Sequence, residues 1–134
     1  GASQLAAALE QNHRLMTLQL GYNAIEARGA KRLAVALEQN STLRSLDLRG
    51  NVIGTQGALH FAAALDRNRA MTSLNLSGND IGVHGANRLV AALERNVHIT
   101  DLDLRDNVLG WQSYARLTEA LEKNWAAGFT TVTV

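Results

Sequence analysis

The sequence predicts an α/β solenoid, in which short parallel strands alternate with helices and each strand–helix unit stacks on the next. An LxxLxL pattern recurs with starting positions 15, 43, 71 and 99, which differ by 28 each time. The second half of each period has the apolar spacing of an amphipathic helix. Strands separated by a helix run parallel, and helices are wider than strands. We therefore expect a curved array with strands on its concave face and helices on its convex face.

A partial helix is predicted at the start of the chain, over residues 3–12. Leu5, Ala8 and Leu9 share one face of this helix, and Asn12 is placed to end it. An asparagine recurs at this position, at residues 12, 40, 68, 96 and 124. Asparagine tolerates the left-handed conformation that closes many helices, so we expect these residues to cap their helices in that conformation.

Short strands are predicted over residues 17–20, 45–48, 73–76 and 101–104. The alternation of side chains in the first strand turns Leu18 and Leu20 inward and Gln19 outward. One unit cannot cover its own leucines. We therefore expect stacked units to bury them in one continuous core.

An asparagine follows each strand at a fixed offset, at Asn23, Asn51, Asn79 and Asn107. The chain must turn there while its backbone amides face inward. A buried carboxamide can both donate and accept, so it can satisfy backbone groups that would otherwise lack a partner. We interpret these four residues as a structural ladder.

Helices are predicted over residues 27–39, 55–67, 83–95 and 111–123. In the first of them Ala30, Leu33 and Leu37 face inward. Small residues stand near the helix starts, at Gly29, Gly57, Gly85 and Ser113. We expect them to let each helix approach the strand layer closely.

A fifth strand is predicted over residues 129–134, where Phe129, Val132 and Val134 repeat the apolar pattern two residues late. No further strand follows it in the sequence. Its open hydrogen-bonding groups could pair with another chain, which predicts a homodimer through this edge.

Aromatic residues are concentrated in the last 24 positions, at Trp111, Tyr114, Trp125 and Phe129. Large rings there can cover the leucines of the last repeat, as terminal repeats of solenoids tend to do. They can instead form a contact patch, because aromatic anchors concentrate binding energy. We favour the cap and keep the contact patch as the alternative.

The unit from Leu43 to Asn68 shows the repeat most completely. Its first half contains Leu43, Leu46, Leu48, Asn51 and Ile53. Its second half contains Gly57, Ala58, Phe61, Ala64, Leu65, Asp66 and Asn68. On these residues the chain resembles the leucine-rich repeat family, specifically the long repeats of the ribonuclease-inhibitor type. The second half is similar to repeats of NOD-like receptors and of related bacterial and protist effectors. The resemblance implies a protein-binding solenoid, a single domain over residues 1–134, which we expect to be a fragment of a longer protein.

Charge and composition narrow the range of partners and compartments. The chain has 13 Lys and Arg against 12 Asp and Glu, so it lacks the basic field that draws proteins to nucleic acid or to anionic membranes. We expect neither partner. The chain has no cysteine, whereas extracellular proteins of the family it resembles usually carry disulfide-linked caps. We therefore expect a cytoplasmic protein, with a bacterial effector delivered into a host cell as the alternative.

The sequence shows no catalytic, cofactor or metal motif. It lacks GxSxG, a glycine-rich phosphate loop, HxxxH and HExxH. The histidines fall at different positions of the repeat, at His13, His60, His84 and His98. They offer no column of metal ligands. We expect no enzymatic activity, no cofactor and no metal site.

The outward strand side chains form the surface that most often binds the partner in the family the chain resembles. Asp47 with Arg49, and Asp103 with Arg105, place opposite charges two residues apart on this face, where cross-strand pairing with neighbours would contribute at most about 1 kcal/mol. The candidate partner-binding residues are Gln19, Tyr22, Asp47, Arg49, Asn75, Asp101, Asp103 and Arg105. The predicted function is a protein–protein interaction module that binds through its concave strand face.

Two other functions stay open. The repeats could space or shield the neighbouring domains of a larger receptor or effector, in which case the polar face is simply solvated. The scaffold also resembles that of GTPase-activating proteins of the Ran type, which act through loops at the strand ends.

Overall fold

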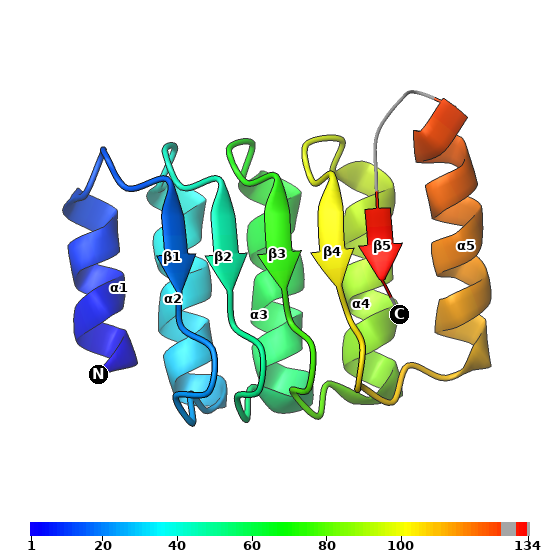
Figure 1. Cartoon of the computed structure of the whole chain (residues 1–134), viewed down its shortest axis with the longest axis horizontal. Coiled ribbons are helices and arrows are strands. Elements are labelled where there is room, and N and C mark those ends of the chain that lie inside the picture. Colours follow the sequence, from blue (N-terminus) through cyan, green and yellow to red (C-terminus); the bar gives the residue numbers. More distant parts are fainter. Residues whose placement is uncertain (127–130, 134) are drawn as a thin grey trace.

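A computed structural model describes residues 1–126 and 131–133, in which helices and strands alternate along the whole chain (Figure 1). The elements are α1 (Ala2–Gln11), β1 (Thr17–Gln19), α2 (Ala27–Gln39), β2 (Ser45–Asp47), α3 (Gly54–Arg67), β3 (Ser73–Asn75), α4 (Gly82–Arg95), β4 (Asp101–Asp103), α5 (Trp111–Ala126) and β5 (Thr131–Thr133). The strands form one layer and the helices a second layer behind it. The predicted α/β solenoid, with strands on the concave face and helices on the convex face, is confirmed.

The strands form a single parallel sheet in the order β1-β2-β3-β4-β5. Leu18 pairs with Leu46, and Leu46 pairs with Leu74, so each strand is in register with the next one a full period later. The last strand is shifted, because Asp101 pairs with Thr131 instead of a residue 28 positions on. This agrees with the two-residue delay in the sequence. Phe129 and Val134 of the predicted strand lie outside the described residues, and the homodimer through this edge stays a prediction.

The inward leucines of the strands and the apolar faces of the helices form one continuous core among the described residues. Leu46 and Leu74 are 1% exposed, and Phe61 of α3 is completely buried among them. The predicted continuous core of stacked leucines is therefore confirmed. No described helix combines the length and the apolar character that crossing a bilayer requires.

The glycines near the helix starts allow close packing between neighbouring helices. A Cβ added to Gly57 would collide with the Ile53 side chain and would lie 2.9 Å from the Cβ of Ala30 in the preceding helix. A Cβ at Gly85 would similarly lie 3.0 Å from the Cβ of Ala58. The sequence correctly predicts a need for small residues. The neighbours that require them are the isoleucine just before the same helix and an alanine of the preceding helix, however, and not the strand layer.

The asparagines that end the helices are not in the left-handed conformation that we expected. Asn40 has φ −83° and ψ 124°, which is an extended backbone. Its Oδ1 accepts hydrogen bonds from the N–H groups of Thr42 at 3.0 Å and Leu43 at 2.8 Å. Its Nδ2 donates to the carbonyl oxygens of Leu9 and Asn12, both at 2.9 Å. The side chain therefore closes the helix and also joins two repeats, which a left-handed backbone cap would not do.

The asparagines that follow the strands form the predicted ladder. The Asn51 Oδ1 accepts from the backbone N–H groups of Asn23 at 3.0 Å and Ile25 at 2.9 Å. Its Nδ2 donates to the carbonyl oxygens of Leu20 at 2.9 Å and Leu48 at 2.7 Å. This ladder is confirmed. Together with the helix-ending asparagines it ties the repeats to one another at both ends of the short strands.

The C-terminal helix departs from two expectations. It continues to Ala126, so Asn124 lies within the helix and does not end it. Trp111 is 78% exposed and Tyr114 is 54% exposed, so neither ring covers the core as a cap would. The side chains of Trp125 and Phe129 lie outside the described part of the chain. For Trp111 and Tyr114 the cap interpretation is wrong, and the contact patch stays a prediction.

Candidate protein-binding face

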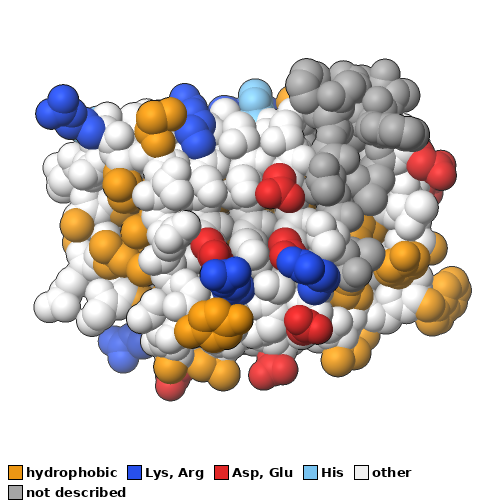
Figure 2. Space-filling view, in the orientation of Figure 1, with side chains coloured by type: hydrophobic (Ala, Val, Ile, Leu, Met, Phe, Trp, Pro, Cys, Tyr) orange, Lys and Arg blue, Asp and Glu red, His pale blue; other side chains and the backbone are white. Residues whose placement is uncertain are grey.

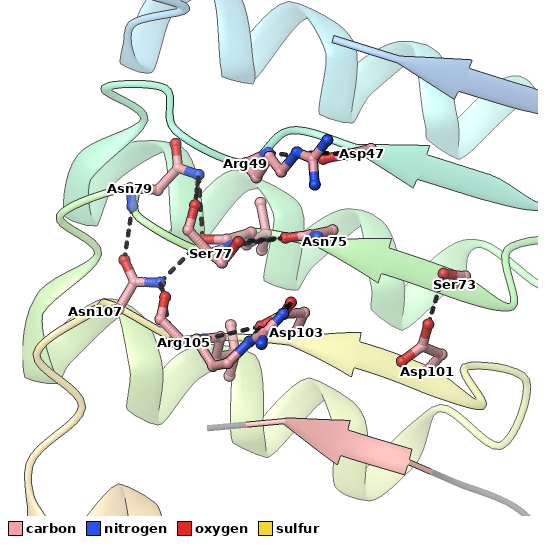
Figure 3. Close-up of polar contacts among 12 residues, drawn as sticks. Asp47, Arg49, Ser73, Asn75, Ser77, Asn79, Asp101, Asp103, Arg105 and Asn107 are labelled. Atoms are coloured by element: carbon pink, nitrogen blue, oxygen red, sulfur yellow. Dashed lines mark hydrogen bonds and ion pairs between the residues drawn. The ribbon is translucent and has the colours of Figure 1, made fainter. Parts of the chain in front are cut away.

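The outer face of the sheet is polar, and its charged side chains gather toward the carboxyl ends of the strands (Figure 2). Because the strands are parallel, the residues that follow each strand lie along one edge of the sheet. Most of the predicted partner-binding residues stand on the strands or just beyond this edge. Figure 3 shows the polar contacts of six of these residues and of their neighbours, the six being Asp47, Arg49, Asn75, Asp101, Asp103 and Arg105.

Asp103 and Arg105 form the tightest ion pair of this face. The Arg105 Nη2 lies 2.6 Å from the Asp103 Oδ2, and the Arg105 Nε and backbone N–H both donate to Oδ1, at 3.0 and 3.1 Å. The hydrogen bond from the Arg105 guanidinium holds the pKa of Asp103 below its usual value, although burial acts in the opposite direction. The same hydrogen bond raises the pKa of Arg105. The negative charge of the Asp103 carboxylate is therefore already paired with the positive charge of Arg105.

Asp47 and Arg49 repeat this arrangement more loosely. The Arg49 Nε lies 3.4 Å from the Asp47 Oδ2, and the Arg49 backbone N–H donates to Oδ1 at 3.0 Å. Asn75 stands at the same position of its repeat, and its Oδ1 accepts from the backbone N–H of Ser77 at 2.9 Å. Asp47 and Asp103 each pair with the arginine two residues along the chain and not across the sheet. Each such side chain shapes the turn that ends its strand, as aspartate and asparagine commonly do.

Tyr22 is the large aromatic side chain at this edge. It is 75% exposed, and its backbone has φ 59°, a conformation that non-glycine residues rarely adopt. The same position in the next two repeats holds Gly50 and Gly78, with φ 62° and 60°. The Tyr22 ring lies directly against Gly50, where a Cβ would collide with it. The Arg49 guanidinium carbon stands 5.7 Å from the ring centroid, within the range of a cation–π contact.

The structure therefore brings some of the candidate residues together and leaves others apart. Tyr22, Arg49 and Asp47 form one cluster, and Asp103 with Arg105 forms a second. Asp101 accepts a hydrogen bond from the Ser73 hydroxyl at 3.1 Å across the sheet, which is a cross-strand contact (Figure 3). Gln19 is exposed on β1 and makes no hydrogen bond through its side chain to a described residue.

The backbone strain at Tyr22 was not predicted, although the sequence contains a signal for it. Aligning the repeats places Tyr22 in a column with Gly50, Gly78 and Asp106, and glycine and aspartate after a strand indicate a left-handed turn. Among the described residues, no group of three His, Cys, Asp or Glu side chains is arranged to hold a metal ion. The arrangement offers hydrogen bonds, paired charges and one exposed ring, which are the means of recognition between proteins.

The family model for the leucine-rich repeat matches residues 11–34, 39–62, 67–89 and 95–110, more than half of the chain. The chain belongs to the leucine-rich repeat family. The four matched segments follow the 28-residue period, and each contains a strand of the parallel sheet. The affiliation of this leucine-rich repeat protein to the ribonuclease-inhibitor type or to NOD-like receptors stays a prediction.

Two solved structures share this leucine-rich repeat fold. The leiomodin-1 actin-binding site 2 is 23% identical, with a TM-score of 0.84, and the match covers 94% of this chain and 73% of that one. The tropomodulin C-terminal domain of Caenorhabditis elegans is 17% identical, with a TM-score of 0.80, and the match covers 94% of this chain and 76% of that one. At these identities the likeness shows the fold. No curated protein matches this chain.

Proposed function

We propose that this leucine-rich repeat protein is an interaction module that binds a protein partner through its concave strand face. The observation that carries the proposal is Tyr22, an exposed ring kept on a positive-φ backbone where the next two repeats have Gly50 and Gly78 and the fourth has Asp106. Such strain costs on the order of 1–3 kcal/mol and is concentrated at functional sites. Tyrosine and arginine are also enriched among the residues that dominate binding energy, and here they lie against each other.

The charges of this face suggest how the partner is recognised. Asp47 and Asp103 are each paired with an arginine, so neither acid presents an unpaired charge. Arg49 and Arg105 remain more than half exposed along their side chains. Each guanidinium has five N–H groups, and some stay available for a partner. We therefore propose a partner that contributes carbonyl or carboxylate acceptors and an apolar group to pack on Tyr22.

The comparisons suggest one partner to assay. The leiomodin-1 structure is an actin-binding site by its title, and its fold covers nearly all of this chain. We propose actin as a first candidate to test by co-sedimentation with filaments and by titration of monomers. Cytoplasmic localisation is likewise a proposal, supported by the absence of cysteine. That the chain is not an enzyme stays a prediction.

The test is the affinity of an identified partner for single variants. Tyr22→Gly removes the ring and leaves the residue type that the next repeats carry, so the turn is retained. We expect Tyr22→Gly and Arg49→Ala to weaken binding at least about tenfold, as substitutions of anchor residues do. Val35→Ala, at a 42% exposed side chain on the convex face, is the matched control and should leave affinity unchanged.

Two outcomes would contradict this proposal. Wild-type affinity in Tyr22→Gly, Arg49→Ala and Arg105→Ala would place the partner elsewhere. A loss of binding in Val35→Ala comparable to that in Tyr22→Gly would place it on the helices. If the chain only spaces neighbouring domains, no variant of either face should alter the binding of any protein.

A further inference from the structure

A hollow of about 360 Å³ lies where the chain leaves α2 and α3 and enters β2 and β3. The two loops that form it are at the amino ends of the strands, opposite to the edge that carries Tyr22 (Figure 1). Further repeats flank the hollow on both sides, since α1 and β1 precede it and α4 and β4 follow it. The hollow therefore belongs to the interior of the array.

The walls of this hollow carry more positive than negative charge. They contain three arginines, Arg44, Arg67 and Arg69, and one acid, Glu38. The Arg67 Nη1 lies 2.9 Å from the Glu38 Oε2, so the acid is already paired. Three arginines against one glutamate leave an excess of two positive charges in one small region, whereas the whole chain has a net charge of +1.

The two remaining arginines are directed to the hollow from neighbouring loops. The Arg44 Nη1 donates to the Ala70 carbonyl oxygen at 2.8 Å, and Ala70 is itself part of the wall. This bond uses one of the five N–H groups of the guanidinium and holds the others beside the hollow. Arg69 is exposed, and its side chain makes no hydrogen bond or ion pair with a described residue.

The repeat itself does not require arginine at either position. Methionine or threonine replaces Arg44 in the other repeats, and histidine, serine or valine replaces Arg69. These equivalent residues are Met16, Thr72, Thr100, His13, Ser41 and Val97. The packing of the array therefore tolerates several residue types there, and the two arginines need another explanation than the fold.

We propose that this hollow binds the phosphate group of a phosphorylated serine or threonine in a partner protein. Such a group carries about −1.5 to −2 charges at about pH 7 and presents three acceptor oxygens. The planar guanidinium matches phosphate oxygens with pairs of parallel N–H groups. Arg44 and Arg69 supply these donors, and the excess of two positive charges balances the ligand.

The charge of the hollow favours a phosphate over a carboxylate. One carboxylate would balance only one of the two free guanidinium groups. The carboxyl ends of α2 and α3 border the hollow and carry a partial negative charge, which further weakens the attraction for a singly charged ligand. The excess is also confined to this hollow, whereas an anionic membrane or a nucleic acid attracts an extended basic surface.

The ligand can be identified by selecting random peptides with a fixed central phosphoserine against the whole chain. The tightest peptide is then synthesised in three forms, with phosphoserine, serine or glutamate at the central position. We expect the phosphoserine form to bind at least about tenfold more tightly than either of the others, because they lack the second charge and the third oxygen.

The arginines are tested with residues that neighbouring repeats already carry. Arg44→Thr introduces the residue type of the next repeat, and Arg69→Ser that of the preceding one, so the fold is retained. We expect each variant to bind the phosphoserine peptide at least about tenfold more weakly. Arg88→Ala is the matched control, because it removes an exposed positive charge from α4, outside the hollow. Neither this variant nor Tyr22→Gly should change the affinity, so the result is independent of the concave-face proposal.

The arginine side chains can be followed directly by nuclear magnetic resonance of their Nε–H groups. Saturation with the phosphoserine peptide should shift the resonances of Arg44 and Arg69 and leave that of Arg88 in place. Equal affinity for the phosphoserine and glutamate forms would overturn the proposal. Failure to select any phosphopeptide, or wild-type affinity in both Arg44→Thr and Arg69→Ser, would overturn it too. Tighter binding to phosphatidylserine vesicles than to the peptide would overturn it in favour of a membrane surface.

Discussion

The interior repeats and the N-terminal repeat carry the same motif, yet they differ in burial. Leu74 is 1% exposed, whereas Leu15 of the first repeat is 36% exposed and Leu18 is only partly buried. Asn79 is completely buried, whereas its equivalent Asn23 is exposed. Among the described residues, the interior repeats have a strand on each side, and β1 has one on a single side. The repeat motif therefore fixes where a side chain lies in its unit, and the repeats on both sides determine how deeply that side chain is buried.

The largest difference in stability between these two regions should appear when equivalent leucines are replaced by alanine. Leu74→Ala removes a completely enclosed side chain and should lower the free energy of unfolding by about 2–5 kcal/mol. Leu18→Ala, at the equivalent position, should cost less than about 2 kcal/mol because the side chain is partly exposed and its cavity is open to water. Urea denaturation of both variants measures the difference. Equal losses in the free energy of unfolding would show that Leu18 is as well buried in solution as Leu74.

The asparagine ladder should show a smaller difference of the same kind. The Nδ2 of Asn79 donates to the carbonyl oxygens of Leu48, Leu76 and Ser77, at 2.9, 3.1 and 3.0 Å. Asn79→Ala leaves buried carbonyl groups without a donor and should cost about 1–3 kcal/mol.

The matched variant is Asn23→Ala. Among the described residues the Asn23 Nδ2 donates to the Gly21 carbonyl oxygen at 3.0 Å, at an exposed site that water can reach. Its loss should be below about 1 kcal/mol. Thermal unfolding of the pair measures both values, and a cost for Asn23→Ala as large as that for Asn79→Ala would refute a dependence on burial.

The smallest difference in stability should appear between variants of the two ion pairs of the strand face. The pKa of Asp103 is lowered by the hydrogen bond from Arg105, so this carboxylate stabilises the fold above its unfolded pKa of about 3.9. That stability is lost as the pH falls through the lower pKa of the folded state. We expect the stability difference between wild type and Asp103→Asn to shrink by at most about 1 kcal/mol between about pH 7 and about pH 2.

Asp47→Asn is the comparison for this titration. The Asp47–Arg49 contact is 3.4 Å long, against 2.6 Å for Asp103–Arg105, and the Asp47 side chain is 23% exposed against 11%. The substitution should therefore change the free energy of unfolding less than Asp103→Asn at neutral pH. A larger effect for Asp47→Asn, measured by urea denaturation at each pH, would contradict the order read from these contacts.

The repeat period was sufficient to predict most of the fold. It placed α2 at its observed bounds and located α3 and α4 to within one residue of their first residue. This success has a physical reason: each apolar position of the motif faces the same environment in every interior repeat. The ladder formed by Asn51 and its equivalents was predictable on the same ground, because a turn with inward amides needs a polar partner.

The details that the sequence did not predict depend on groups outside the local motif. The backbone of Asn40 is extended because its side chain reaches carbonyl groups of the preceding repeat, and these groups cannot be located from helix-capping preferences. The exposure of Trp111 and Tyr114 was also open, since the same rings could cover a core or contact a partner. Asp47 and Arg49 were correctly placed on one face, but the choice of pairing partner depends on the turn that follows the strand.

Helices that are neighbours in the chain pack against each other, and every described strand pairs with its sequence neighbours. Duplication or loss of one 28-residue segment would therefore join surfaces that already fit each other. An ancestral gene could lengthen or shorten the array without redesigning its interior. Each such event would alter the reach of the sheet along a target by about 4.8 Å, the spacing between neighbouring strands.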